Sequence, residues 1–163
     1  MTDLAPLAAL AAELIEAAKP RGLKVATAES CTGGLVVGVL TEIAGSSAVV
    51  DRGFVTYSNE AKNQMLGVPL DLIERVGAVS REVAVAMVEG TLAHSDADMA
   101  VSVTGIAGPG GGSSEKPVGL VHFAAMRRDQ AAGHVECRFG DVGRSEIRLA
   151  SVRQALLMMQ QLI

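Results

Sequence analysis

The sequence predicts an α/β fold, a three-layer α/β/α domain with a mixed central sheet. Short apolar runs of strand length alternate with segments of helical periodicity, which is typical of a sheet that carries helices on its faces. Two strand-like runs, residues 120–128 and 133–140, are separated by only a short turn. Because so short a turn joins antiparallel strands, we expect a mixed sheet rather than a wholly parallel one. A length of 163 residues favours a single domain, residues 1–163.

The first half of the chain is predicted to contain two strands among helices. Leu7 and Leu14 belong to a set of apolar residues at helical spacing, which favours an amphipathic N-terminal helix over a signal peptide. Gly45 is suited to end the second helix, and Ser58 or Asn59 to cap the third. In order, the expected elements are a helix within 1–19, a strand at 23–30, a helix at 33–45, a strand at 47–58, a short helix at 59–67 and a further helical turn or two at 70–77.

The second half is predicted to contain three strands between two helices. Ser80 caps a helix over residues 80–96, and Glu82 lies near the positive end of its dipole. Residues 98–108 have the pattern of a strand that runs into a Gly-rich loop. The two strands named above follow, and a long helix from about 144 to 162 ends the chain.

Composition and charge exclude several classes of function. The net charge is −4, and the only aromatic residues besides histidine are one Tyr and three Phe. Neither electrostatics nor stacking therefore favours a nucleic-acid partner or an anionic membrane. The two cysteines and three scattered histidines form no metal motif, and no apolar run approaches the ~18 residues that span a bilayer. We expect a cytoplasmic protein with no metal, no cofactor, and no nucleic-acid or membrane partner.

Three polar residues follow predicted strands at comparable positions. The stretch ATAESCTGG, residues 26–34, runs a small-residue strand into Ser30 and Cys31 and then into two glycines. Tyr57 and Thr104 end two later strands in the same way. Functional residues of layered α/β sheets gather at the carboxyl ends of strands. We therefore expect Ser30, Tyr57 and Thr104 to share a site.

A serine becomes a nucleophile only when a neighbouring base removes its proton. No histidine is tied to Ser30 by the sequence, but Lys62 lies in the first turns of a predicted helix. Burial and the helix N-terminus would both lower the pKa of this lysine from about 10.4 toward neutrality. Gly33 and Gly34 allow close backbone approach and are expected to offer free N–H groups to an oxyanion.

From the residues alone, each of these features also has a purely structural interpretation. Ser30 can be a helix cap, and Cys31 a small buried hydrophobe. The loop at 105–119 does not match a dinucleotide fingerprint and is either an anion-binding nest or a mobile surface loop. Arg144 and Lys116 could each meet a phosphate, but arginine and lysine are also common on any surface.

Five motifs occur in order along the chain: TAESCTGG, RGFVTYSNEAK, VSREVA, TGIAGPGGG and EKPVG. Together they resemble the CinA C-terminal domain family, the nicotinamide-nucleotide amidases, from about residue 5 to the C-terminus. The resemblance implies a stand-alone α/β/α domain that assembles as a homodimer or higher homo-oligomer. It also implies a nucleotide substrate, nicotinamide mononucleotide (NMN), whose carboxamide is hydrolysed to give nicotinic acid mononucleotide and ammonia in pyridine nucleotide recycling.

The same resemblance implies roles for individual residues. Ser30 matches the nucleophile and Lys62 its general base, which makes a metal-independent Ser–Lys amidase. Tyr57 matches an assisting residue, Thr104 a residue of the active site, and Arg144 a basic residue that serves the substrate phosphate. Backbone contacts with the substrate are expected from Gly33, Gly34, Gly105 and Gly108.

The chain departs from the family pattern before its last helix. Family members commonly have Gly-Asp-Arg there, whereas Arg144 follows Gly143 and the aspartate is shifted upstream to Asp141. Two rival functions are weighed against the amidase. One is a non-catalytic nucleotide-binding or regulatory module, and the other is a thiol enzyme that uses Cys31.

Overall fold

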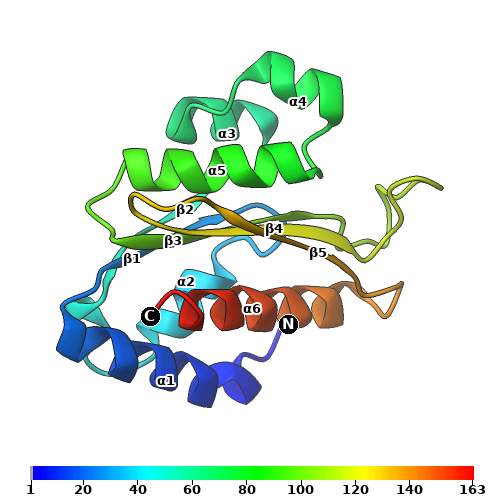
Figure 1. Cartoon of the computed structure of the whole chain (residues 1–163). Coiled ribbons are helices and arrows are strands. Elements are labelled where there is room, and N and C mark those ends of the chain that lie inside the picture. Colours follow the sequence, from blue (N-terminus) through cyan, green and yellow to red (C-terminus); the bar gives the residue numbers. More distant parts are fainter. Residues whose placement is uncertain (1) are drawn as a thin grey trace.

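The computed structural model of the chain describes residues 2–163 and contains a five-stranded sheet between two layers of helices (Figure 1). Helices α3 (Asn59–Leu66), α4 (Leu70–Val76) and α5 (Arg81–Ala93) lie on one side of the sheet, with α5 next to it. Helices α1 (Ala8–Ala18), α2 (Leu35–Thr41) and α6 (Arg144–Gln160) lie on the other side, with α1 farthest from the sheet (Figure 1). The predicted three-layer α/β/α class is thus confirmed, and the order of strands and helices is the predicted one.

The sheet combines parallel and antiparallel pairs. Its strands are β1 (Val25–Glu29), β2 (Val50–Val55), β3 (Met99–Gly105), β4 (Leu120–Arg127) and β5 (Gly133–Arg138). They lie in the order β2-β1-β3-β4-β5, in which β1 is parallel to both neighbours while β4 and β5 run antiparallel. The prediction of a mixed sheet is therefore confirmed.

The register of the three parallel strands brings their carboxyl ends to one level. Glu29 at the end of β1 lies opposite Val55 in β2 and Val103 in β3. The ladder continues one residue further, because Ser30 donates its N–H to Val103 O at 2.9 Å and Thr56 donates to Glu29 O at 2.9 Å. Residues that follow these strands therefore meet at one edge of the sheet.

The helices are shorter than the sequence pattern predicts, and each ends before its expected C-terminal bound; the second ends at Thr41 rather than at Gly45. They are α1 (Ala8–Ala18), α2 (Leu35–Thr41), α3 (Asn59–Leu66), α4 (Leu70–Val76), α5 (Arg81–Ala93) and α6 (Arg144–Gln160), with 3-10 turns at Ala5–Leu7, Lys19–Arg21 and Ser46–Ala48. The helix expected at 33–45 begins only at Leu35, because Gly33 and Gly34 take positive φ angles of 59° and 96°. The first residue of the expected N-terminal helix lies outside the described residues. No helix of residues 2–163 combines the length and apolarity needed to cross a membrane.

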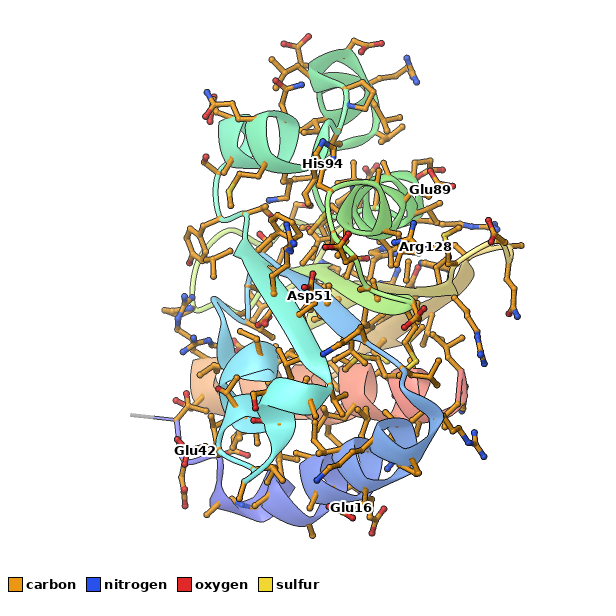
Figure 2. All side chains as sticks on the ribbon, turned by 90° about the vertical axis from the view of Figure 1, so that its left-hand side faces the viewer. Glu16, Glu42, Asp51, Glu89, His94 and Arg128 are labelled. Atoms are coloured by element: carbon orange, nitrogen blue, oxygen red, sulfur yellow. The ribbon has the colours of Figure 1, made fainter. Side chains whose placement is uncertain are left out.

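Apolar side chains fill both interfaces between the sheet and its helices. Strand β4 is buried on both faces: Phe123 belongs to the core under α1 and α6, and Ala124 to the core under α5. Arg128, which follows β4, donates to the carbonyls of Leu92 and Ala97 near the end of α5 (Figure 2). This contact anchors α5 at the edge where β3 begins, opposite the edge where Ser30 lies.

Candidate active site

Ser30 and Lys62 lie in contact at the carboxyl edge of the parallel strands. Lys62 Nζ is 3.0 Å from Ser30 Oγ and donates a second hydrogen bond of 2.8 Å to the carbonyl of Thr56. The start of α3 fixes the position of the lysine, because Ser58 Oγ caps the helix by accepting the N–H of Ala61 at 3.0 Å. A lysine one turn into α3 can thus point its amine back toward the end of β1.

The amine of Lys62 is buried without a counter-ion. The side chain is 1% exposed, and no carboxylate among residues 2–163 lies within ion-pair distance of it. Burial lowers the pKa of Lys62 below its ordinary value of 10.5, an effect only partly opposed by the nearby Cys31. A neutral amine can accept a proton, so this pair has the chemistry of a base beside a nucleophile.

The turn after Ser30 is held by a buried carboxylate that the sequence analysis did not single out. Glu29 is fully buried and accepts four hydrogen bonds: from Thr27 Oγ1 at 3.1 Å, and from the N–H groups of Gly34, Val36 and Val37 at 3.0, 3.0 and 2.9 Å. These donors include the first N–H groups of α2, which otherwise lack partners inside the helix. The sequence does contain a signal that identifies Glu29: it is an acidic residue shortly before a predicted helix, where a carboxylate interacts favourably with the N-terminal N–H groups.

The expected free N–H groups of Gly33 and Gly34 are not found. Gly33 donates to Ser30 O at 3.0 Å and Gly34 donates to Glu29, so both groups already have acceptors. Neither glycine lines the cavity at Ser30. The prediction that these two N–H groups are free is therefore wrong, because the turn uses them to hold itself together.

A cavity of about 280 Å³ opens above Ser30 and Lys62. It brings together seven of the predicted site residues, namely Ser30, Tyr57, Lys62, Thr104, Gly105, Gly108 and Arg144. The remaining lining residues are Cys31, Asn59, Ala78, Val79, Ile106, Ala107, Gly110 and Gly111. A larger hollow of about 720 Å³ lies under the 109–114 segment, but it contains neither Ser30 nor Lys62. We therefore place the candidate site in the smaller cavity.

Three of the predicted residues lie around the cavity rather than on the reacting pair. Arg144 donates to Gly108 O at 2.8 Å and to the hydroxyl of Tyr57 at 3.1 Å. The Tyr57 side chain is 60% exposed, which places it at the rim. Thr104 is buried and donates its hydroxyl to Ala78 O at 2.8 Å, so it fixes the segment before α5 against the end of β3.

Two other candidates are poorly suited to chemistry at this site, Cys31 because its thiol stays protonated and Lys116 because of its position. Cys31 is buried, and burial raises the pKa of its thiol to about 12, which leaves almost no thiolate near neutrality. Lys116 donates to Val76 O at 2.7 Å and does not line the cavity. Residues 2–163 contain no cluster of three or more His, Cys, Asp or Glu side chains arranged to hold a metal ion.

Comparison with known proteins matches nearly the whole chain. The sequence model of the CinA C-terminal domain matches residues 7–163. The nicotinamide-nucleotide amidohydrolase PncC of Escherichia coli is 52% identical over 157 residues, which cover 96% of this chain and 93% of that protein. A CinA-like protein of a Synechococcus strain is 50% identical over 148 residues, covering 90% of this chain and 35% of that longer protein.

Solved structures match the fold equally well. The competence/damage inducible protein CihA of Agrobacterium tumefaciens superposes with a TM-score of 0.94 at 60% identity, over 96% of this chain and 94% of that chain. A CinA superfamily protein of Escherichia coli superposes with a TM-score of 0.91 at 32% identity, over 100% of this chain and 94% of that chain.

Proposed function

The chain belongs to the CinA C-terminal domain family, and from this premise we propose that it is an amidohydrolase that converts NMN to nicotinic acid mononucleotide and ammonia. The observation that carries the proposal is the 3.0 Å contact between Ser30 Oγ and the buried amine of Lys62, which has no carboxylate partner among the described residues. The name of the E. coli relative supports the choice of substrate. We extend the proposal to a role in pyridine nucleotide recycling and to assembly as a homodimer or higher homo-oligomer.

The acylation step follows from the geometry of the pair. Neutral Lys62 accepts the proton of Ser30, and the serine oxygen forms a bond to the carboxamide carbon. The tetrahedral intermediate then breaks its C–N bond, and the ammonium form of Lys62 returns the proton to the departing ammonia. The carbonyl of Thr56 accepts an N–H of the amine at 2.8 Å, and so helps to aim the lone pair of Lys62 at Ser30.

Deacylation uses the same two side chains in reverse roles. Lys62 accepts a proton from water, whose oxygen attacks the acyl carbon, and the C–O bond to Ser30 then breaks as the proton returns to the serine oxygen. The products are the carboxylic acid, which loses its proton to water, and the free enzyme. Lys62, whose amine lies 3.0 Å from Ser30 Oγ, carries the proton in each of these steps.

The substrate itself favours the neutral form of the base. The pyridinium ring of NMN carries a positive charge, and attack by Ser30 on the carboxamide of that ring would bring this charge near Lys62, whose amine lies 3.0 Å from Ser30 Oγ. Two unit charges about 5 Å apart repel by about 3 kcal/mol with an effective dielectric constant near 20. Apolar side chains of Val79 and Ile106 line the cavity where the ring would lie, while Arg144 at the rim is the cation that faces the phosphate.

The proposal is tested by incubating the purified protein with NMN and measuring ammonia together with nicotinic acid mononucleotide. We expect turnover by the wild type and a loss of at least about a thousandfold in Ser30→Ala and in Lys62→Met. Lys19→Met, a change at an exposed lysine, is the matched control and should retain activity. Binding of NMN without any turnover would contradict the proposal and favour a non-catalytic nucleotide-binding module.

A further inference from the structure

The turn that follows Ser30 leaves two consecutive N–H groups without an oxygen acceptor. Within residues 2–163 the N–H groups of Cys31 and Thr32 donate to no oxygen, although those of Ser30, Gly33 and Gly34 all do. Cys31 lines the same cavity as Ser30, whereas Thr32 follows it in the turn without lining the cavity. An N–H on the residue after a nucleophile lies close to the oxygen that becomes negative during acyl transfer.

Arg148 on α6 holds the carbonyls of this turn. Its Nε donates to Cys31 O at 3.1 Å and its Nη2 donates to Thr32 O at 3.0 Å. The planar guanidinium thus spans two successive peptide groups with the fixed fork of donors that a lysine lacks. No carboxylate among the described residues lies within ion-pair distance of Arg148. These two carbonyls are therefore its main partners, and its charge lies directly against the turn.

Fixing the carbonyls also fixes the N–H groups. In a trans peptide the C=O and the following N–H point in opposite directions. Arg148 holds Cys31 O toward itself, so the N–H of Thr32 must point away from the guanidinium. In the same way Ser30 O accepts from Gly33 at 3.0 Å, which directs the N–H of Cys31 away from that contact.

We propose that the N–H groups of Cys31 and Thr32 are the oxyanion donors for reaction at Ser30, and that Arg148 is a positioning residue for them. Arg148 orients the N–H of Thr32 through Cys31 O, and it holds the turn in which Gly33 orients the N–H of Cys31. The guanidinium acts through the two peptide groups and does not itself touch the substrate. Glu29 fixes the other end of the same turn by accepting the N–H of Gly34 at 3.0 Å. The inference rests on the proposed nucleophilic role of Ser30, but it does not depend on which amide is hydrolysed.

The test compares Arg148→Ala and Arg148→Lys with Arg153→Ala, which removes an exposed arginine from the same helix. The first readout is the rate at which an alkyl fluorophosphonate labels Ser30, followed by intact mass. In that reaction Ser30 Oγ forms a bond to phosphorus, fluoride leaves, and the serine proton passes to Lys62. The second readout is kcat and KM for NMN, and urea unfolding of every variant is measured in parallel.

We expect Arg148→Ala to label at least fivefold more slowly than the wild type, and Arg153→Ala within twofold of it. With NMN, kcat should fall at least fivefold while KM stays within about threefold, because the donors act on the transition state rather than on binding. The labelling rate and kcat of Arg148→Lys should lie between those of the wild type and Arg148→Ala, because a single ammonium cannot span both carbonyls.

The inference is overturned if the labelling rate of Arg148→Ala is less than fivefold below that of the wild type, or if Arg153→Ala loses as much of its labelling rate as Arg148→Ala. It is also overturned if Arg148→Ala raises KM for NMN and leaves kcat unchanged. Should Arg148→Ala fail to fold, Arg148→Lys decides: a rate below the wild type by threefold or more supports the inference, and a smaller change overturns it. Labelling of Ser30 without ammonia release from NMN refutes the proposed substrate alone. An unlabelled Ser30 in the wild type refutes both.

Discussion

Replacing Lys62 by methionine is expected to change the way stability depends on pH. Methionine has nearly the length and volume of the lysine side chain but carries no amine, so the core stays filled. The variant loses the hydrogen bonds to Ser30 Oγ and Thr56 O, which is a pH-independent cost of about 1–3 kcal/mol. It also loses the titrating amine, and the effect of that loss on the unfolding free energy changes with pH in a definite direction.

The sign follows from the lowered pKa of Lys62. Below the folded-state pKa both states bind the proton, and the penalty for burying a charged amine is fully present. Between that pKa and the ordinary value of 10.5 the unfolded state binds one proton more than the folded state. Lys62 therefore makes the unfolding free energy rise with pH in this window, by up to about 1.4 kcal/mol per pH unit. Cys31 acts in the opposite direction above pH 9.0, because its unfolded thiol ionises there while the folded thiol, with a pKa of about 12, keeps its proton. This contribution is common to the wild type and Lys62→Met and cancels in the difference between them.

The measurement is urea unfolding of the wild type and Lys62→Met at several pH values between 6 and 10.5, followed by circular dichroism. The quantity of interest is the difference in unfolding free energy between the two proteins, which cancels groups common to both. We expect this difference to rise with pH in favour of the wild type, whereas the difference for Lys19→Met stays flat. A flat difference for Lys62→Met would refute the lowered pKa.

Three further predictions concern neighbouring groups. Cys31→Ala should keep NMN hydrolysis within about threefold of the wild type in the ammonia assay, because burial raises the thiol pKa to about 12; loss of turnover would restore the thiol mechanism. Glu29→Gln should lower the unfolding free energy, measured in urea, by about 2–4 kcal/mol, because the new amide nitrogen would face an N–H donor. The control Glu42→Gln, at an exposed position (Figure 2), should change it little, and equal effects of the two substitutions would contradict the role of Glu29. Burial lowers the pKa of His122, so the wild type should lose stability relative to His122→Gln as the pH falls below 6.5; a relative gain in urea titrations would contradict this.

Much of the fold was predictable because its signals are local. Strand-length apolar runs, helix periodicity and the cap at Ser58 gave the correct order of elements, and the short turn before β5 gave the mixed sheet. The meeting of Ser30 with Lys62 also follows from local signals. The carboxyl ends of parallel strands converge, and α3 starts directly after β2.

The rest depends on contacts that no local pattern encodes. Arg148 reaches Cys31 from 117 residues away in the chain, and nothing in the spacing of either residue indicates the pairing. The expectation for Gly33 and Gly34 failed because both glycines adopt left-handed conformations. In the turn that results, the N–H of Gly33 donates to Ser30 O and the N–H of Gly34 donates to Glu29. The burial of Lys62 depends on packing between α3 and the sheet edge, which the sequence does not specify residue by residue.

The pH dependence of kcat/KM for NMN tests the neutral-lysine base most directly, because this parameter reports the ionisations of the free enzyme. We predict an ascending limb governed by one group, with an apparent pKa clearly below 10.5. A limb at about 10.5 would show that the amine of Lys62 titrates like one in open water, and would contradict its role as the base for Ser30.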